Sequence, residues 1–114
     1  QRAKYGLTAL EMGDDNLTAA AQTRAEEIAV VNSHVRPDGS KCFTVLKDYG
    51  VTDTPTGENA AWGSVSPEEV VNAWMNSEGH RANILNPEAR KMSVGYYYNS
   101  NSTWGHQWIQ IFTK

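Results

Sequence analysis

The chain has 114 residues, of which 39% are hydrophobic and 20% charged, which is the composition of one globular domain. No apolar run is long enough to span a bilayer, so no transmembrane segment is expected. The formal net charge of −3 and the pI near 5.5 leave no basic patch, which argues against nucleic acid as a partner.

The N-terminal part of the chain predicts two helical segments. Residues 1–5 have the pattern of the end of a helix that stops at Gly6. Residues 14–16 offer an N-cap for a second helix over about residues 17–31. The expected apolar face of this helix consists of Leu17, Ala20, Ala21, Ile28 and Val31, and the expected solvent face of Gln22, Arg24, Glu26 and Glu27.

Turn signals and short segments occupy the middle of the chain. Residues 36–39, Arg-Pro-Asp-Gly, predict a turn, and residues 43–49 predict a short helix closed by Gly50. Residues 51–57 form a loop that leads into Glu58 and Asn59. The apolar residues 60–62 follow, either as a strand or as an irregular piece.

The stretch 66–87 predicts a helix with clear ends. Ser66 is the expected N-cap, Pro67 fits the first helical position and Glu69 completes a capping box. Gly79 is expected to end the helix in a left-handed conformation, which places His80 just beyond it. The apolar stripe consists of Val70, Val71 and Trp74.

The end of the chain changes to the period of a strand. Residues 92–98 alternate as one strand, residues 99–103 form a polar turn, and residues 104–112 return as a second strand. One face of the returning strand is expected to carry Trp104, His106, Trp108, Gln110 and Phe112. Helices first and a hairpin last predict an α+β domain in which helices cover an antiparallel sheet.

Three side chains next to turns or helix ends are candidates for chemistry: His34, Glu58 and His80. Two imidazoles, one carboxylate and a water form a typical ligand set for zinc. Without a metal, the carboxylate would orient a histidine that acts as general base. The residues are 24 and 22 positions apart and form no short H-x-x-x-H pair, so two hydrogen-bonded structural histidines remain a third interpretation.

Nucleophilic catalysis has weaker support in the sequence. Ser33, Ser64, Ser66 and Ser77 all lie outside a G-x-S-x-G elbow. Cys42 is the single cysteine, which excludes an intrachain disulfide. A nucleophilic thiol paired with a histidine is one interpretation, but we expect Cys42 to serve half-buried packing. His106 alternates with aromatic residues and is expected at the surface or in sheet packing.

Four motifs in a fixed order cover nearly the whole chain: HVRPDG at 34–39, GEN at 57–59, WMNSEGHRANIL at 74–85 and WIQIF at 108–112. The series resembles the CAP superfamily, the SCP-like domains of cysteine-rich secretory proteins, venom allergens and pathogenesis-related plant proteins. It is most similar to the bacterial, disulfide-poor branch.

The resemblance implies a three-layer α-β-α sandwich with a small antiparallel sheet and a solvent-open cleft. Residues 1–114 would form a single such domain whose first helix is mostly missing, with Arg2, Gly6 and Leu10 as its remnants. The family is typically exported, so an extracellular or cell-envelope location is expected. Residues 1–114 show no signal-peptide pattern of their own.

The family cleft holds two histidines and two acidic residues, and some members bind zinc or another divalent ion there. By resemblance, His34 and His80 are the histidines, and Glu58 is the glutamate that ligates a metal, acts as a base or holds a histidine in position. The second acid has only a weak counterpart. The remaining residues expected in or behind the cleft are Asn59, Ser77, Glu78 and Arg81.

These observations leave three functions open. The first is a secreted binding module whose cleft takes a divalent ion and an extended extracellular ligand such as a peptide, glycan or lipid. The second is a metal-dependent hydrolase, a peptidase by preference, that uses His34, His80 and Glu58. The third is a structural envelope-interaction domain with a vestigial cleft.

Overall fold

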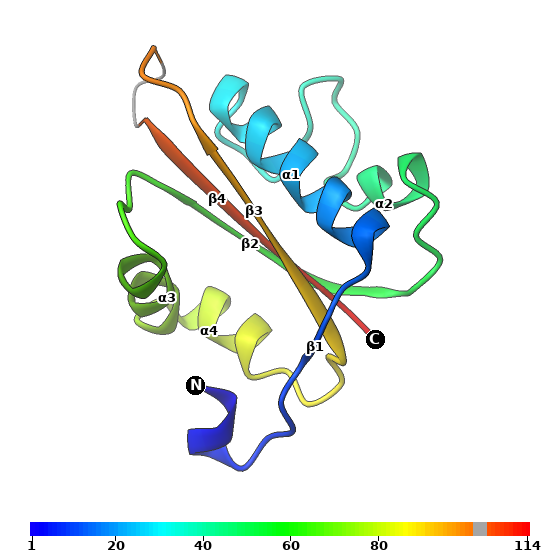
Figure 1. Ribbon diagram of the computed structural model, residues 1–114, viewed down its shortest axis with the longest axis vertical. Coiled ribbons are helices and arrows are strands. Elements are labelled where there is room, and N and C mark those ends of the chain that lie inside the picture. Colours follow the sequence, from blue (N-terminus) through cyan, green and yellow to red (C-terminus); the bar gives the residue numbers. More distant parts are fainter. Residues whose placement is uncertain (102–104) are drawn as a thin grey trace.

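The computed structural model describes residues 1–101 and 105–114, and its helices and strands lie in three layers (Figure 1). A four-stranded sheet in the order β1-β3-β4-β2 separates α1 and α2 from α3 and α4. The expected α-β-α sandwich is therefore confirmed. The strands are β1 (Glu11–Met12), β2 (Pro55–Trp62), β3 (Lys91–Tyr98) and β4 (His106–Thr113), and the helices are a short 3₁₀ helix (Arg2–Tyr5), α1 (Asp15–Val30), α2 (Thr44–Asp48), α3 (Pro67–Met75) and α4 (Glu78–Ile84).

The sheet is mixed rather than purely antiparallel. β4 pairs antiparallel with both β2 and β3, as the hairpin pattern predicts. β1, however, pairs parallel with β3 over two residues. Such a short strand shows no alternation in the sequence, so its pairing was missed. Trp104 and part of the predicted turn lie outside the described residues.

The first long helix begins where the sequence predicts. The Asp14 side chain caps α1 by accepting a hydrogen bond from Leu17 N at 2.9 Å. Its buried face includes the expected small alanines and Ile28. Two predictions for this helix were wrong: Val31 is 38% exposed, and Arg24, expected in solvent, is completely buried.

Each face of the sheet has its own hydrophobic core. Ile109 and Ile111 of β4 pack with Ala60 against α1 and α2. Trp108 and Phe112 point to the other face and pack with Val70, Trp74 and Ile84 of α3 and α4. This alternation along one strand explains why β4 is almost entirely buried, since helices cover both of its faces.

The predicted helix over residues 66–79 is two helices. Ser66 Oγ accepts from Glu69 N at 3.1 Å and caps α3, which ends at Met75. Ser77 has an extended backbone and precedes α4, whose first residue is Glu78. Gly79 lies inside α4 without a positive φ, so it ends nothing and the prediction was wrong. His80 therefore lies on a helix.

The shorter predictions were confirmed. Gly39 N donates to Arg36 O at 2.8 Å in the predicted turn. α2 is followed by Gly50 with φ 70°, and the 3₁₀ helix by Gly6 with φ 73°. The segment left open as strand or irregular piece is the end of β2, which starts earlier than expected and includes Glu58 and Asn59.

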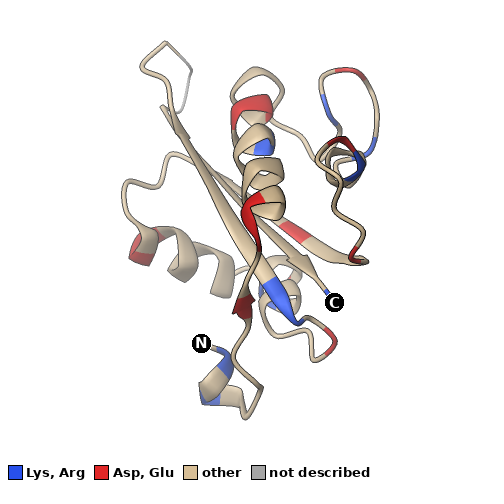
Figure 2. Cartoon of the chain, turned by 45° about the vertical axis from the view of Figure 1, so that its right-hand side comes forward, with Lys and Arg blue, Asp and Glu red and all other residues tan. Residues whose placement is uncertain are grey.

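Positively and negatively charged positions are both spread along the described chain. Figure 2 shows Lys and Arg positions and Asp and Glu positions on helices, strands and loops. Among the described helices, none has the length and apolar composition that crossing a membrane requires.

Candidate functional site

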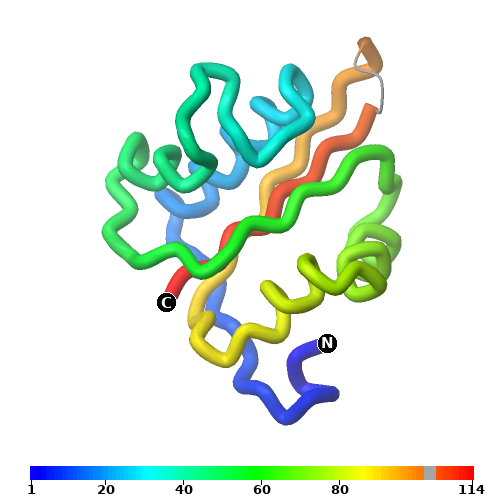
Figure 3. Tube along the Cα trace, turned by 180° about the vertical axis from the view of Figure 1, so that it is seen from behind, coloured from blue at the N-terminus to red at the C-terminus, as the bar shows by residue number. Residues whose placement is uncertain are grey.

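β2 brings the candidate residues to the edge of the sheet. It is the last strand in the order β1-β3-β4-β2, so its outer side faces no further strand. Seen from behind, it runs between the α1–α2 layer and the α3–α4 layer (Figure 3). Because side chains alternate along a strand, Glu58 faces α1 and Asn59 faces α4. One dipeptide therefore reaches both helical layers.

The Glu58 carboxylate is buried and binds two partners. Arg24 of α1 donates from Nε to Oε2 at 2.9 Å and from Nη2 to Oε1 at 3.1 Å. Nδ1 of His34, in the loop after α1, lies 2.8 Å from the same Oε1. An ionised carboxylate only accepts, so His34 Nδ1 is the donor and the other ring nitrogen stays available. The His34 side chain is 54% exposed.

These contacts set the ionisation of the pair. Burial raises the pKa of Glu58, but the hydrogen bonds from His34 and Arg24 and their charges outweigh it, so the pKa lies below its ordinary value. The hydrogen bond to Glu58 raises the pKa of His34. The pair is therefore an ion pair at mildly acidic pH and a neutral imidazole oriented by a carboxylate above the pKa of His34.

Asn59 fixes the second histidine from the opposite face. Its Nδ2 donates to the backbone oxygen of His80 at 3.1 Å, and its Oδ1 accepts from Asn83 Nδ2 at 2.9 Å. Gly57 makes room for Asn83, because a Cβ at that position would lie 2.4 Å from Asn83 Oδ1. The G-E-N motif thus attaches α4 to β2 with a buried amide network.

His80 is half-buried at this edge. Its desolvation lowers its pKa, and the charge of His34 lowers it further. The two imidazoles therefore interact electrostatically, although they come from opposite helical layers. Because its pKa is lowered, the His80 imidazole is uncharged at neutral pH, which is the form that can accept a proton.

A complete ligand set for a metal is not assembled in the described residues: no three His, Cys, Asp or Glu side chains come together as a metal-binding group. Both Glu58 oxygens are already bonded to Arg24 or His34. The arrangement therefore offers two imidazoles and one orienting carboxylate. Orientation of a histidine by a carboxylate is common at metal sites and at general bases.

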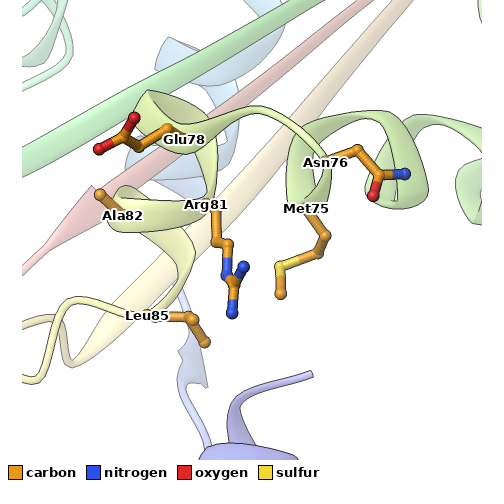
Figure 4. A pocket seen from close by; sticks show the side chains of 6 residues that line it. All are labelled: Met75, Asn76, Glu78, Arg81, Ala82 and Leu85. Carbon is orange, nitrogen blue, oxygen red and sulfur yellow. The ribbon is translucent and has the colours of Figure 1, made fainter.

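The remaining predicted cleft residues lie elsewhere on α4. Glu78 and Arg81 line a hollow of about 500 Å³ between α3 and α4, with Met75 and Leu85 on its other sides (Figure 4). In this view Arg81 points away from Glu78, and its Nη2 donates to the hydroxyl of Tyr5 at 2.8 Å. Ser77 is the N-cap residue of α4, so the start of this helix accounts for its position and no catalytic role is needed.

The third histidine, His106, is hydrogen-bonded in the hairpin, and the cysteine, Cys42, is buried. His106 Nδ1 lies 2.6 Å from the Tyr96 hydroxyl, within the aromatic packing predicted for the hairpin. Cys42 is buried, and desolvation with the nearby Glu58 charge raises the pKa of its thiol to about 11. A thiol with this pKa is protonated at neutral pH and is a poor nucleophile.

Sequence reasoning missed Arg24 and the two residues behind it, Glu27 and Arg36. Glu27 binds Arg24 Nη1 at 2.9 Å and Arg36 Nη2 at 2.8 Å. A signal was available: Arg24 lies seven residues after Leu17 and four before Ile28, so helical periodicity places it on the buried stripe. A charge in that position predicts a buried partner.

Comparison with known proteins places this arrangement in a family. Residues 1–112 match the family model described as CAP, the cysteine-rich secretory protein family. The uncharacterized protein YkwD of Bacillus subtilis is 41% identical over 111 residues, which are 96% of this chain and 42% of YkwD. The chain thus spans less than half of that relative.

Solved structures agree with the family assignment. An extracellular protein of Bacillus anthracis that contains an SCP domain superposes with a TM-score of 0.85 at 26% identity, over 99% of this chain and 36% of that one. An outer surface protein of Borrelia burgdorferi gives a TM-score of 0.78 at 28% identity, over 99% and 83% of the two chains. The chain belongs to the CAP family of cysteine-rich secretory proteins.

Proposed function

We propose that this CAP domain works outside the cell or at the cell envelope and binds a divalent metal ion, zinc by preference, together with an extended ligand such as a peptide, glycan or lipid. The observation that carries the proposal is the half-exposed His34, whose Nδ1 is fixed by the buried Glu58 and whose other ring nitrogen stays available. The charge of His34 also acts on the half-buried His80. The location is supported by the two solved relatives, which are described as extracellular and outer surface proteins.

The donor set fits a weak, exchangeable metal site. His34 and His80 would hold the ion, and Glu58 would orient His34 from behind, because its oxygens are already hydrogen-bonded. Two protein ligands leave positions for water and for oxygen atoms of the ligand. When bound, the ion supplies a Lewis acid that polarises a carbonyl or phosphoryl oxygen of that ligand.

Isothermal titration of the metal-free protein with zinc at about pH 7.5 tests the proposal, since the histidines must be neutral to bind. The His34→Ala/His80→Ala double variant should lose the binding. The matched control is His106→Ala, because His106 belongs to the packing of the hairpin. Equal zinc binding by the double variant and the wild type would refute the site. A double variant altered only in stability would favour a structural domain.

A metal-dependent hydrolase is the second candidate, favoured by one observation. The pKa of His80 is lowered, so its imidazole is neutral at pH 7, which is the form that would hold a metal ion able to activate water. The zinc-loaded protein would be incubated with a peptide mixture, and the fragments measured by mass spectrometry. Cleavage that disappears in Glu58→Gln while zinc binding remains would establish it. Intact peptides would leave recognition as the function.

A further inference from the structure

The buried guanidinium of Arg24 closes a ring of contacts around His34. Its Nη2 donates to the backbone oxygen of Ser33 at 3.0 Å, immediately before the histidine. The same Nη2 donates to Glu58 Oε1 at 3.1 Å, the oxygen that also binds His34 Nδ1 at 2.8 Å. Arg24 Nη2 thus holds both the backbone just before His34 and the Glu58 oxygen that the His34 ring contacts.

A second set of charges holds Arg24 in turn. Glu27 accepts from Arg24 Nη1 at 2.9 Å and is gripped by Arg36 through Nε and Nη2. Arg36 reaches on to α2, where Nη1 donates to Asp48 Oδ2 at 2.8 Å and to Thr44 Oγ1 at 3.0 Å. The Arg24 guanidinium therefore makes four hydrogen bonds, two to Glu58, one to Glu27 and one to the Ser33 carbonyl, and has little freedom to rotate.

We propose that Arg24 is the positioning residue of the His34 site: it locks the Glu58 carboxylate and the Ser33 carbonyl so that His34 keeps its proton on Nδ1 and presents Nε2 to a ligand. The tautomer follows from the contact, because the nitrogen that faces a carboxylate carries the proton. Two requirements are met by one side chain. Arg24 supplies the charge that keeps Glu58 an acceptor, and its planar fork fixes where that acceptor lies.

A purely structural role explains this geometry less well. Buried ion pairs replaced by apolar groups of similar size often leave stability unchanged or higher, so stability alone does not require a charged network in the core. This network leads from the surface of α2 to a histidine that is 54% exposed. The end point is a solvent-facing imidazole, which contributes less to packing than a buried side chain and is open to a ligand.

Nitrogen NMR of His34 in the metal-free protein, well above its titration midpoint, tests the proposal directly. We expect the Nδ1–H tautomer in the wild type and a mixture dominated by Nε2–H in Arg24→Lys, since an ammonium cannot reproduce the fork. The matched control is Arg2→Lys, which alters another buried arginine, whose hydrogen bonds within the described residues go to the backbone oxygens of Thr8, Ile84 and Asn86. It should keep the wild-type tautomer.

A folded Arg24→Lys variant with the wild-type tautomer would overturn the proposal, as would the same tautomer change in Arg2→Lys. If Arg24→Lys does not fold, Glu27→Gln replaces it. This variant keeps Arg24 but removes one of its anchors, so a smaller change in the same direction is expected, and no change would overturn the assignment.

The zinc readout rests on the proposed function, whereas the tautomer readout does not. If zinc binds as proposed, Arg24→Lys should weaken it by about 10–100-fold, the usual effect of removing a residue behind a metal ligand. Absence of zinc binding in the wild type would refute the metal site and leave the tautomer result as an independent test of Arg24.

Discussion

Gly95 of β3 lies against the backbone of α1, and its replacement by alanine tests this close approach. A Cβ at this position would lie 2.1 Å from Ala21 O and 2.7 Å from Gln22 N, both backbone atoms of α1. An ordinary contact begins at 3.4 Å, so the helix would have to move by about 1.3 Å. Backbone atoms cannot rotate away as a side chain would.

The expected loss of stability follows from this clash. Overpacking a core costs about 1–3 kcal/mol, and a clash with backbone belongs at the upper end of that range. Replacing a glycine also lowers the conformational entropy of the unfolded chain, which offsets about 0.4–1 kcal/mol of this loss of stability. We therefore expect Gly95→Ala to lower the free energy of unfolding by about 2–3 kcal/mol, or the melting temperature by roughly 8–20 °C.

Urea denaturation followed by tryptophan fluorescence measures the effect, with Gly79→Ala as the matched control. Gly79 lies in α4, and a Cβ added there would meet no atom within 4 Å, so alanine should raise stability by about 0.4–1 kcal/mol. The two substitutions are chemically identical and should have opposite signs. Equal, small effects would show that α1 does not rest on Gly95.

Three further predictions concern the site and the second core. Zinc affinity should fall as pH decreases, with a midpoint above the ordinary histidine value, because the pKa of His34 is raised while that of His80 is lowered; titrations from about pH 5.5 to 8.5 would show it, and a flat profile would exclude both histidines. Trp74→Phe should lower the free energy of unfolding by about 2–4 kcal/mol in urea, because it empties buried volume and removes the 3.1 Å bond to Ala60 O; an unchanged midpoint would contradict that role. Alkylation of Cys42 by iodoacetamide should be slow in the native protein and fast in urea, because the thiol is buried with its pKa raised to about 11; equal rates would show an accessible thiol.

The fold could be predicted largely because its signals are local. Caps at Asp14 and Ser66 and the alternation over the hairpin all depend on residues near in sequence. The break between α3 and α4 was missed because the sequence was interpreted as one helix that ends at Gly79, and Ser77 was considered only for its chemistry. In the structure Ser77 is the N-cap residue of α4 without a side-chain capping bond, and Gly79 lies in the first turn of that helix.

The site could be predicted only in part, since its chemistry depends on contacts between distant segments. The sequence named His34, Glu58 and His80, and the structure brings the first two into a hydrogen bond. It could not show that Arg24 reaches Glu58, because that bond joins two elements 34 residues apart. The Arg24–Glu58 pair can be recognised only once the fold is known to bring α1 and β2 together.

The free side of β2 has a consequence for self-association. Gly63 N donates to His106 O at 2.9 Å, and because such pairs alternate along antiparallel strands, the backbone oxygens of Glu58 and Ala60 face away from β4. Asn83 Nδ2 and Trp74 Nε1 donate to these two oxygens.

An open strand edge is a template on which a second molecule can add a strand, and repeated addition leads to fibrils. Here two side chains occupy the positions that an incoming strand would need. An additional strand would therefore have to displace a buried indole and an amide before it could form its first hydrogen bonds. The residues that hold α3 and α4 on the sheet also protect the domain from edge-to-edge aggregation.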